Sequence, residues 1–175
     1  GVDYIVKVAK ELKRLGSNIR ILLVGDGREK AQVIAEAKEA EVFEENIFFE
    51  TAMAKEDMPI LFSAATMASN LVIDMPEAQV NSANKFFDSL AASKPILLNH
   101  GGWMHDIVKS HYCGLAMWQQ PIELVAKQLH EKMNNEEWLE QAAIGAKKLA
   151  VQDFDRDLLA EQLMSVISAV VEKKS

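Results

Sequence analysis

Residues 19–27 have the sequence IRILLVGDG, a short apolar run that ends in two glycines around an aspartate. A run of this length bounded by glycine is typical of a buried β-strand, which we expect over residues 19–24. On either side the apolar residues recur at helical spacing, which predicts helices over residues 2–15 and 29–41. Strands that alternate with helices are typical of α/β proteins, in which helices cover both faces of a parallel sheet.

The same alternation continues through the chain. About five parallel strands are predicted, in a doubly wound, Rossmann-like sheet. Such a sheet usually begins with a strand, whereas this chain begins in a helix, so we expect that a first strand is missing ahead of Gly1. Residues 1–175 would form a single domain with a helical C-terminal tail at 151–175. The further strands are predicted at 47–49, 68–73, 95–98 and 114–117, and the further helices at 56–65, 84–92, 104–110, 122–133, 136–151 and 155–172.

The composition is that of an acidic globular protein. With 19 basic and 26 acidic residues the net charge is −7, and 49% of the residues are hydrophobic. A pI near 5.1 argues against nucleic acid and anionic membranes as partners, although it permits a small local phosphate site. No apolar run reaches the roughly 18 residues of a membrane span, and no signal peptide is evident. The single cysteine, Cys113, excludes an internal disulfide and suits the cytoplasm.

A candidate anion site lies in the loop from Asp74 to Ala83 and in the helix that follows it. In an open α/β sheet ligands bind at the carboxyl ends of the strands, where the strand order switches. Ser82 or Asn84 could cap this helix, and its N–H groups and dipole would suit a phosphate. Lys85 adds a cation in the first turn. An ordinary capped helix with a surface lysine is the alternative.

Asp88, Gly25 and Gly27 are further candidates. Asp88 follows Lys85 by three residues on the same side of the helix, where it could accept hydrogen bonds from a ribose diol or form a salt bridge with Lys85. The two glycines let a backbone approach a ligand closely, or they simply form a tight turn. A dinucleotide fingerprint needs a third glycine where this chain has Lys30, so we do not expect NAD.

Neither a metal site nor a catalytic triad is indicated. His100, His105 and His111 lack the helical spacing of zinc ligands, and Cys113 has no second cysteine. The glycine pair in the HGGW segment, residues 100–103, is better explained as a second stretch of backbone that forms a surface of the ligand-binding crevice at the carboxyl ends of the strands.

Taken together, these segments resemble a known family. The order of strand, GDG, helix and strand, followed by SANKFFDSLAASKPILLN at residues 82–99 and a GGW segment, is similar to the C-terminal domain of family-4 glycosyltransferases of the two-domain GT-B fold. The resemblance covers nearly the whole chain. The run from Asn84 to Pro95 is its most specific part and is similar to transferases of bacterial O-antigen and capsule assembly, with the fucosamine-transferase-like subgroup as the nearest.

The resemblance implies roles for individual residues. Asp88 matches the acid that binds the ribose of a nucleotide-sugar donor, and residues 50–53 match the segment that meets the base. In this family the acid is preceded, eight residues earlier, by a glutamate, but Val80 stands there. Glu77 lies nearby and is the candidate to replace it. The residues that match the pyrophosphate seat are Ser82, Ala83, Asn84 and Lys85, and those that match the glycines lining the cleft are Gly25 and Gly27.

We therefore expect the donor-binding half of a retaining glycosyltransferase that transfers a hexose-type sugar in cell-surface polysaccharide synthesis. The donor would be UDP-linked, with no metal or other cofactor, because preorganised charges and dipoles can stabilise the leaving diphosphate. The acceptor, a glycan or lipid-linked sugar, and the catalytic base would belong to an N-terminal domain absent from this chain. That domain would also make any contact with the inner face of the membrane. The alternatives are a non-catalytic nucleotide-binding or regulatory module and a sugar-nucleotide epimerase of the same fold.

Overall fold

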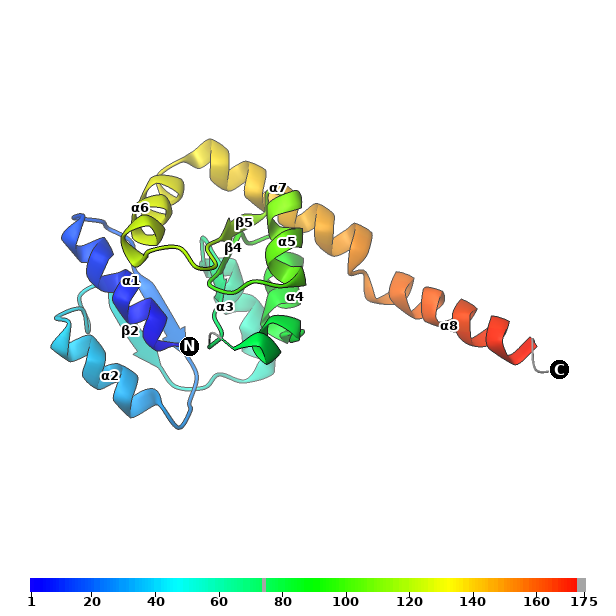
Figure 1. Cartoon of the computed structure of the whole chain (residues 1–175), viewed down its shortest axis with the longest axis horizontal. Coiled ribbons are helices and arrows are strands. Elements are labelled where there is room, and N and C mark those ends of the chain that lie inside the picture. The colour runs from blue at the N-terminus through cyan, green and yellow to red at the C-terminus, as the bar shows by residue number, and fades with distance from the viewer. Residues whose placement is uncertain (74, 173–175) are drawn as a thin grey trace.

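The computed structural model describes residues 1–73 and 75–172, in which helices and parallel strands alternate (Figure 1). The predicted α/β class is confirmed, and the element bounds lie close to those expected. The strands are β1 (Ile21–Val24), β2 (Ile47–Glu50), β3 (Ala68–Asn70), β4 (Ile96–Leu98) and β5 (Gly114–Ala116). The helices are α1 (Asp3–Arg14), α2 (Lys30–Glu39), α3 (Met58–Ala64), α4 (Asn84–Ala91), α5 (Trp103–Ser110), α6 (Ile122–Met133), α7 (Glu136–Asp153) and α8 (Arg156–Glu172), with short 3-10 turns η1 (Lys55–Asp57) and η2 (Pro76–Val80).

The strands form two parallel sheets. β1 pairs with β2, so that Ile21 lies beside Ile47. β3, β4 and β5 form the second sheet in that order, with Ile96 of β4 beside Ala68 of β3 and Gly114 of β5. In the described part of the chain no strand joins β1 to β3. Within the described residues the parallel strands are thus present in two parts, because the edges of β1 and β3 are not bonded to each other.

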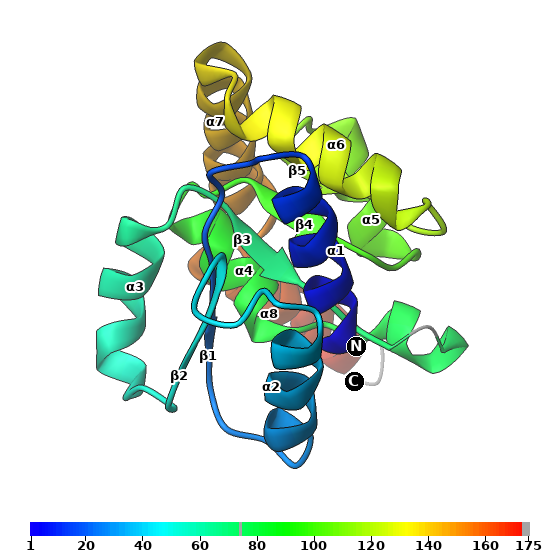
Figure 2. The same cartoon turned by 90° about the vertical axis from the view of Figure 1, so that its left-hand side faces the viewer.

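Helices cover both faces of the strands. Figure 2 shows α3 on one side of β1 and β2, with α1 and α2 on the other. β4 is buried on both faces, because Leu97 belongs to the hydrophobic cluster of α1, α2 and α6, whereas Ile96 and Leu98 belong to that of α4, α5 and α7. Burial of each such side chain contributes about 1.5–3 kcal/mol, which fixes these helices against the strands.

An aromatic cluster anchors α4, the helix that carries most of the predicted site. The Phe86 ring centroid lies 5.4 Å from that of Phe87, 5.5 Å from that of Trp103 and 6.2 Å from that of Phe154. The cluster joins α4 to the start of α5 and to the end of α7.

Helix α8 extends away from the other elements (Figure 1). Its apolar side chains are therefore largely exposed; Leu163 is 61% and Val166 60% accessible. Within residues 1–73 and 75–172, no helix combines the length and apolarity that crossing a bilayer would require.

Candidate functional site

The predicted site residues follow the carboxyl ends of strands in both sheets. Gly25 comes directly after β1, η2 and α4 come after β3, and His100 comes shortly after β4. Parallel strands end at one edge of a sheet, which is where α/β proteins bind ligands. Gly25 and Gly27 follow a strand of one sheet, whereas α4 follows a strand of the other.

The loop after β1 is held by Lys30. Its Nζ donates to Gly25 O at 2.9 Å, to Asp26 Oδ1 at 2.8 Å and to Glu50 O at 3.0 Å, so all three of its donors are used. Ala52 N–H donates to Asp26 Oδ2 at 3.0 Å. The bond from Lys30, followed by that from Ala52, holds the pKa of the Asp26 carboxyl below its usual range. Lys30 thus braces the ends of β1 and β2.

The first turn of α4 has no side-chain cap. Ala83 is the N-cap residue, in extended conformation, and Asn84 is the first residue of the helix. The prediction that Ser82 or Asn84 caps the helix is therefore wrong, because neither side chain accepts from the first-turn N–H groups. Phe86 N–H donates to Ala83 O at 2.9 Å. The N–H groups of Asn84 and Lys85 and the positive end of the helix dipole are left to a solvent or ligand oxygen. Ser82 and Asn84 are exposed and Ala83 is half-buried.

Lys85 and Asp88 project from α4 without a bond to each other. Both side chains are exposed, and no ion pair joins them in the described structure, so the predicted alternative of a salt bridge is not found. Although Lys85 as a residue keeps much accessible surface, its surroundings desolvate the ammonium and lower its pKa. Both groups are thus free to meet a ligand.

His100, which follows β4, has 2% of its surface exposed. Its Nδ1 is 2.8 Å from Gly101 O. Because a carbonyl can only accept, Nδ1 carries the proton, and the buried Nε2 remains an acceptor without a partner. Burial lowers the pKa of His100, partly offset by the bond to Gly101, and the charges of His105 and Lys85 lower it further. A neutral imidazole thus lies within electrostatic reach of Lys85.

The glycine pair after β4 lies in close contact with neighbouring residues, and its expected role as a backbone surface on the crevice stays a prediction. Gly102 has φ +89°, and a Cβ at this position would collide with Gln79 O of η2. A Cβ on Gly101 would lie 2.8 Å from the Trp118 ring. The pair is needed for close packing of η2 and α5. No group of three or more metal-ligating side chains occurs among the residues described.

Asn99 joins the ends of β3 and β4, a role that the sequence analysis missed. Its Oδ1 accepts from Val72 N–H and its Nδ2 donates to Val72 O, both at 2.9 Å. Lys30 was also missed as a brace. Asn99 is a polar residue just after β4, but its partner is the backbone of Val72 beyond β3. Lys30 begins α2, and one of its three acceptors is the backbone of β2.

The structure places fewer contacts around Glu77, the candidate for the second acid of the site. Glu77 is an exposed residue of η2, and Val80, which stands in the position of the family glutamate, is 77% exposed. Asp74, the start of the predicted loop, lies outside the described residues. No described bond directs Glu77 toward α4.

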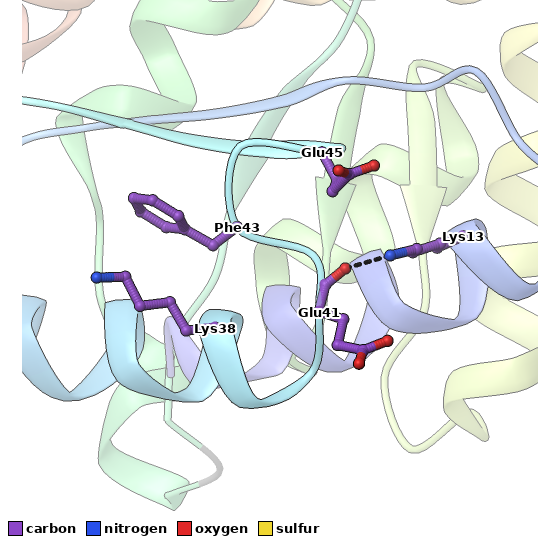
Figure 3. Close-up of a pocket in the computed structure, with 5 residues that line it drawn as sticks. All are labelled: Lys13, Lys38, Glu41, Phe43 and Glu45. Carbon is purple, nitrogen blue, oxygen red and sulfur yellow. Dashed lines mark hydrogen bonds between the residues drawn. The ribbon is translucent and has the colours of Figure 1, made fainter.

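Two surface hollows lie away from the carboxyl ends of the strands and so are separate from this site. One of about 320 Å³ is lined by Lys13, Lys38, Glu41, Phe43 and Glu45 (Figure 3). There Lys13 donates to Glu41 O, and the Lys38 ammonium lies 4.9 Å from the Phe43 ring centroid. These residues belong to the ends of α1 and α2 and to the loop before β2. They are thus remote from the carboxyl edge, where the sequence predicts ligand binding.

A second hollow, of about 460 Å³, lies between the end of α5 and α7. It is lined mostly by apolar groups, including Trp138 and the exposed Ile144. Like the first, it lies away from the carboxyl ends of the strands.

Comparison with known proteins gives one family and several similar structures. A family model described as glycosyl transferases group 1 matches residues 1–149. No curated protein matches the chain.

Three crystal structures are similar in fold. A mutant of TarM from S. aureus, in complex with fondaparinux, alpha-GlcNAc-glycerol and UDP, has a TM-score of 0.78 at 11% identity, over 94% of this chain and 32% of that one. Anabaena Alr3699/HepE in complex with UDP gives 0.76 at 18%, over 93% and 44%. WaaG, a glycosyltransferase involved in lipopolysaccharide biosynthesis, gives 0.71 at 18%, over 88% and 40%. This chain thus spans less than half the length of each.

Proposed function

The chain belongs to the glycosyl transferases of group 1, and on that premise we propose that it forms the donor-binding part of an enzyme that transfers a hexose-type sugar from a nucleotide to an acceptor. The observation that carries the proposal is the uncapped first turn of α4, with Lys85 beside it, at the carboxyl edge of a Rossmann-like fold. Unsatisfied N–H groups and a cation together suit a diphosphate.

The proposed mechanism follows from this charge arrangement. Cleavage of the bond between sugar and phosphate places negative charge on the leaving diphosphate. The N–H groups of Asn84 and Lys85, which the helix orients, and the Lys85 ammonium would stabilise that charge without a metal. Asp88, one turn further along α4, would accept hydrogen bonds from the ribose hydroxyls. Glu77 is the candidate for the second acid of the family.

The base of the nucleotide would lie toward β1 and β2. Gly25 and Gly27 would let the backbone approach the donor closely, because a Cβ at either glycine meets open space. Residues 50–53, which follow β2, would meet the base. Lys30 would preserve the loop shape rather than bind phosphate, since its donors are all used.

We further propose a UDP-linked donor and a role in cell-surface polysaccharide synthesis, in the manner of the family-4, fucosamine-transferase-like enzymes of O-antigen or capsule assembly. The run from Asn84 to Pro95 supports this, as do similar structures bound to UDP and UDP-glucose and one involved in lipopolysaccharide biosynthesis. The enzyme would act in the cytoplasm, on a glycan or lipid-linked acceptor at the inner face of the membrane.

The acceptor and the catalytic base would come from an N-terminal domain of the same protein. The length of the similar structures supports this, since the chain covers only 32–44% of them. The exposed apolar side chains of α8 also suit packing against a further domain.

Nucleotide titration of the full-length protein tests the proposal. UDP, GDP and UDP-sugars are added while thermal unfolding is followed. UDP at 100 times its Kd should stabilise the folded state by about 2.7 kcal/mol. No shift with any nucleotide at millimolar concentration would contradict donor binding. Binding without transfer to any acceptor would favour a regulatory module, and isomerised donor without acceptor would identify an epimerase.

A further inference from the structure

The hydrogen bonding between β1 and β2 continues past the ends of both strands, but with side chains in place of backbone. Gly25 N–H donates to Glu50 O at 3.3 Å, as the last backbone bond of the parallel pairing. In a regular parallel pair the next bond would run from Ala52 N–H to Gly25 O. Instead Ala52 N–H donates to Asp26 Oδ2 at 3.0 Å, and Gly25 O accepts from Lys30 Nζ at 2.9 Å. The Asp26 and Lys30 side chains thus extend the pairing beyond the strands.

Residues 51–53, which follow β2, are held in place by this arrangement. Their side chains are exposed, so packing contributes little to fixing them. Among the residues that the structure describes, the bond from Ala52 N–H to Asp26 is the one hydrogen bond that residues 51–53 form. Asp26 is fixed in turn by Lys30, whose Nζ lies 2.8 Å from Asp26 Oδ1 and 3.0 Å from Glu50 O. The position of residues 51–53 therefore depends on the pair of Asp26 and Lys30.

The backbone groups of residues 51–53 that remain free include donors and acceptors. In the described part of the chain, the N–H and C=O groups of Thr51 and Met53 and the C=O of Ala52 form no hydrogen bond. The edges of nucleobases also carry donors and acceptors, so such groups can pair with them. Bases differ in the order of those groups, and a protein distinguishes them only if its own donors and acceptors are held in place. A braced segment after β2 is therefore suited to read a base.

We propose that Asp26 and Lys30 are positioning residues for recognition of the nucleotide base, because they fix residues 51–53 in the form that the base contacts. This role rests on the proposed function, in which residues 50–53 meet the base. Lys30 itself makes no phosphate contact, because its three donors are occupied within the protein. Loss of either side chain leaves the first turn of α4 intact and loosens only the segment that meets the base.

Binding of nucleoside diphosphates to the full-length protein tests this. UDP, CDP, GDP and ADP share the same diphosphate and differ chiefly in the base, so the ratio of the highest Kd to the lowest measures base recognition. Lys30→Met and Asp26→Ala should each reduce this ratio about 10-fold, mainly by weakening the tightest nucleotide. Because the two side chains act as one brace, the double variant should reduce it no further. Each Kd is measured below the unfolding midpoint of the variant, and Asp26→Ala tests the role independently of any loss of stability in Lys30→Met.

Arg28→Met is the matched control. Arg28 is exposed in the same loop and forms no ion pair in the described structure, so its loss removes the same charge without removing the brace. The ratio of Kd values should therefore equal that of the wild type, even if the lost charge weakens all four nucleotides together.

Three results would overturn the positioning role. The first is an unchanged ratio in Lys30→Met and Asp26→Ala, and the second is an equal fall in Arg28→Met, which would assign the effect to charge. The third is a wild type that binds all four nucleotides equally, which leaves no base recognition to control. If the wild type binds none of them at millimolar concentration, the proposed function fails and this role falls with it. Wild-type binding with unchanged ratios in the variants contradicts the positioning role alone.

Discussion

At the scale of single residues, a lysine determines the form of the loop after β1. Lys30 stands where a dinucleotide-binding loop would have its third glycine, and its three bonds draw Gly25, Asp26 and Glu50 together. Lysine at this position therefore substitutes a side-chain brace for a phosphate-binding turn. The sequence excluded the NAD fingerprint, but it could not predict the brace, because one acceptor is the backbone of a strand 20 residues away.

Replacing Lys30 with Met should destabilise the folded protein by about 1–2 kcal/mol, through loss of its bonds to two backbone carbonyls. Urea unfolding measures this, and Lys10→Met, at an exposed lysine of α1, is the control. An unchanged unfolding midpoint for Lys30→Met would contradict the bracing role.

The same brace predicts a pH dependence. Because the pKa of folded Asp26 is lowered, its contribution to stability is fully present above the unfolded pKa of about 3.9 and is lost as pH falls through the lower folded value. The destabilisation caused by Asp26→Asn should thus be present at pH 7 and should vanish in strong acid. A cost independent of pH would contradict the interaction with Lys30.

At the scale of elements, the end of α4 contains a strained serine. Ser93 has φ +56°, its N–H donates to Leu90 O, and Lys94 N–H donates to Ser89 O, which is the Schellman arrangement that glycine favours. Ser93→Gly should therefore stabilise the protein by about 0.5–1 kcal/mol. Differential scanning calorimetry should show a rise of about 2–4 °C per kcal/mol. Ser93→Ala, which keeps the Cβ, should give no rise.

Replacing glycine with alanine should affect stability differently in the loop after β4 and in the loop after β1. Gly102→Ala should cost at least about 2 kcal/mol, because φ is +89° and the Cβ would collide with Gln79 O. Gly27→Ala, which places its Cβ in open space, should leave thermal stability unchanged and weaken nucleotide binding. Equal stability losses in both variants would contradict this difference between the loops.

Element bounds were predictable because apolar periodicity is local, and so was the edge at which α4 begins. The cap of α4 was mispredicted because Ser82 and Asn84 were judged by residue type, whereas the backbone places Ala83 at the N-cap. The register in which the strands pair was not predictable either. Strand pairing depends on which edges meet in space, and short apolar runs such as residues 96–98 carry no such information.

At the scale of the whole molecule, two parallel sheets present their carboxyl ends to one region. The loop after β1 is rigid through Lys30, and α4 is held by the aromatic cluster around Phe86. Lys85 and Asp88, whose polar groups remain exposed, thus lie on a helix that is held in place by this packing. The net charge of −7 opposes a broad anion surface, so recognition of a diphosphate would rest on these local groups.

The most direct test of the account is the affinity of the full-length protein for UDP, measured by calorimetry with Asp88→Ala and a matched control. Asp88→Ala should weaken binding about 10–100-fold, the loss of one or two hydrogen bonds to a charged group. Asp157→Ala, which removes an exposed carboxylate from α8, should leave the affinity unchanged. Equal affinities for the wild type and both variants would contradict the assignment of the ribose to Asp88 and of the donor to this edge.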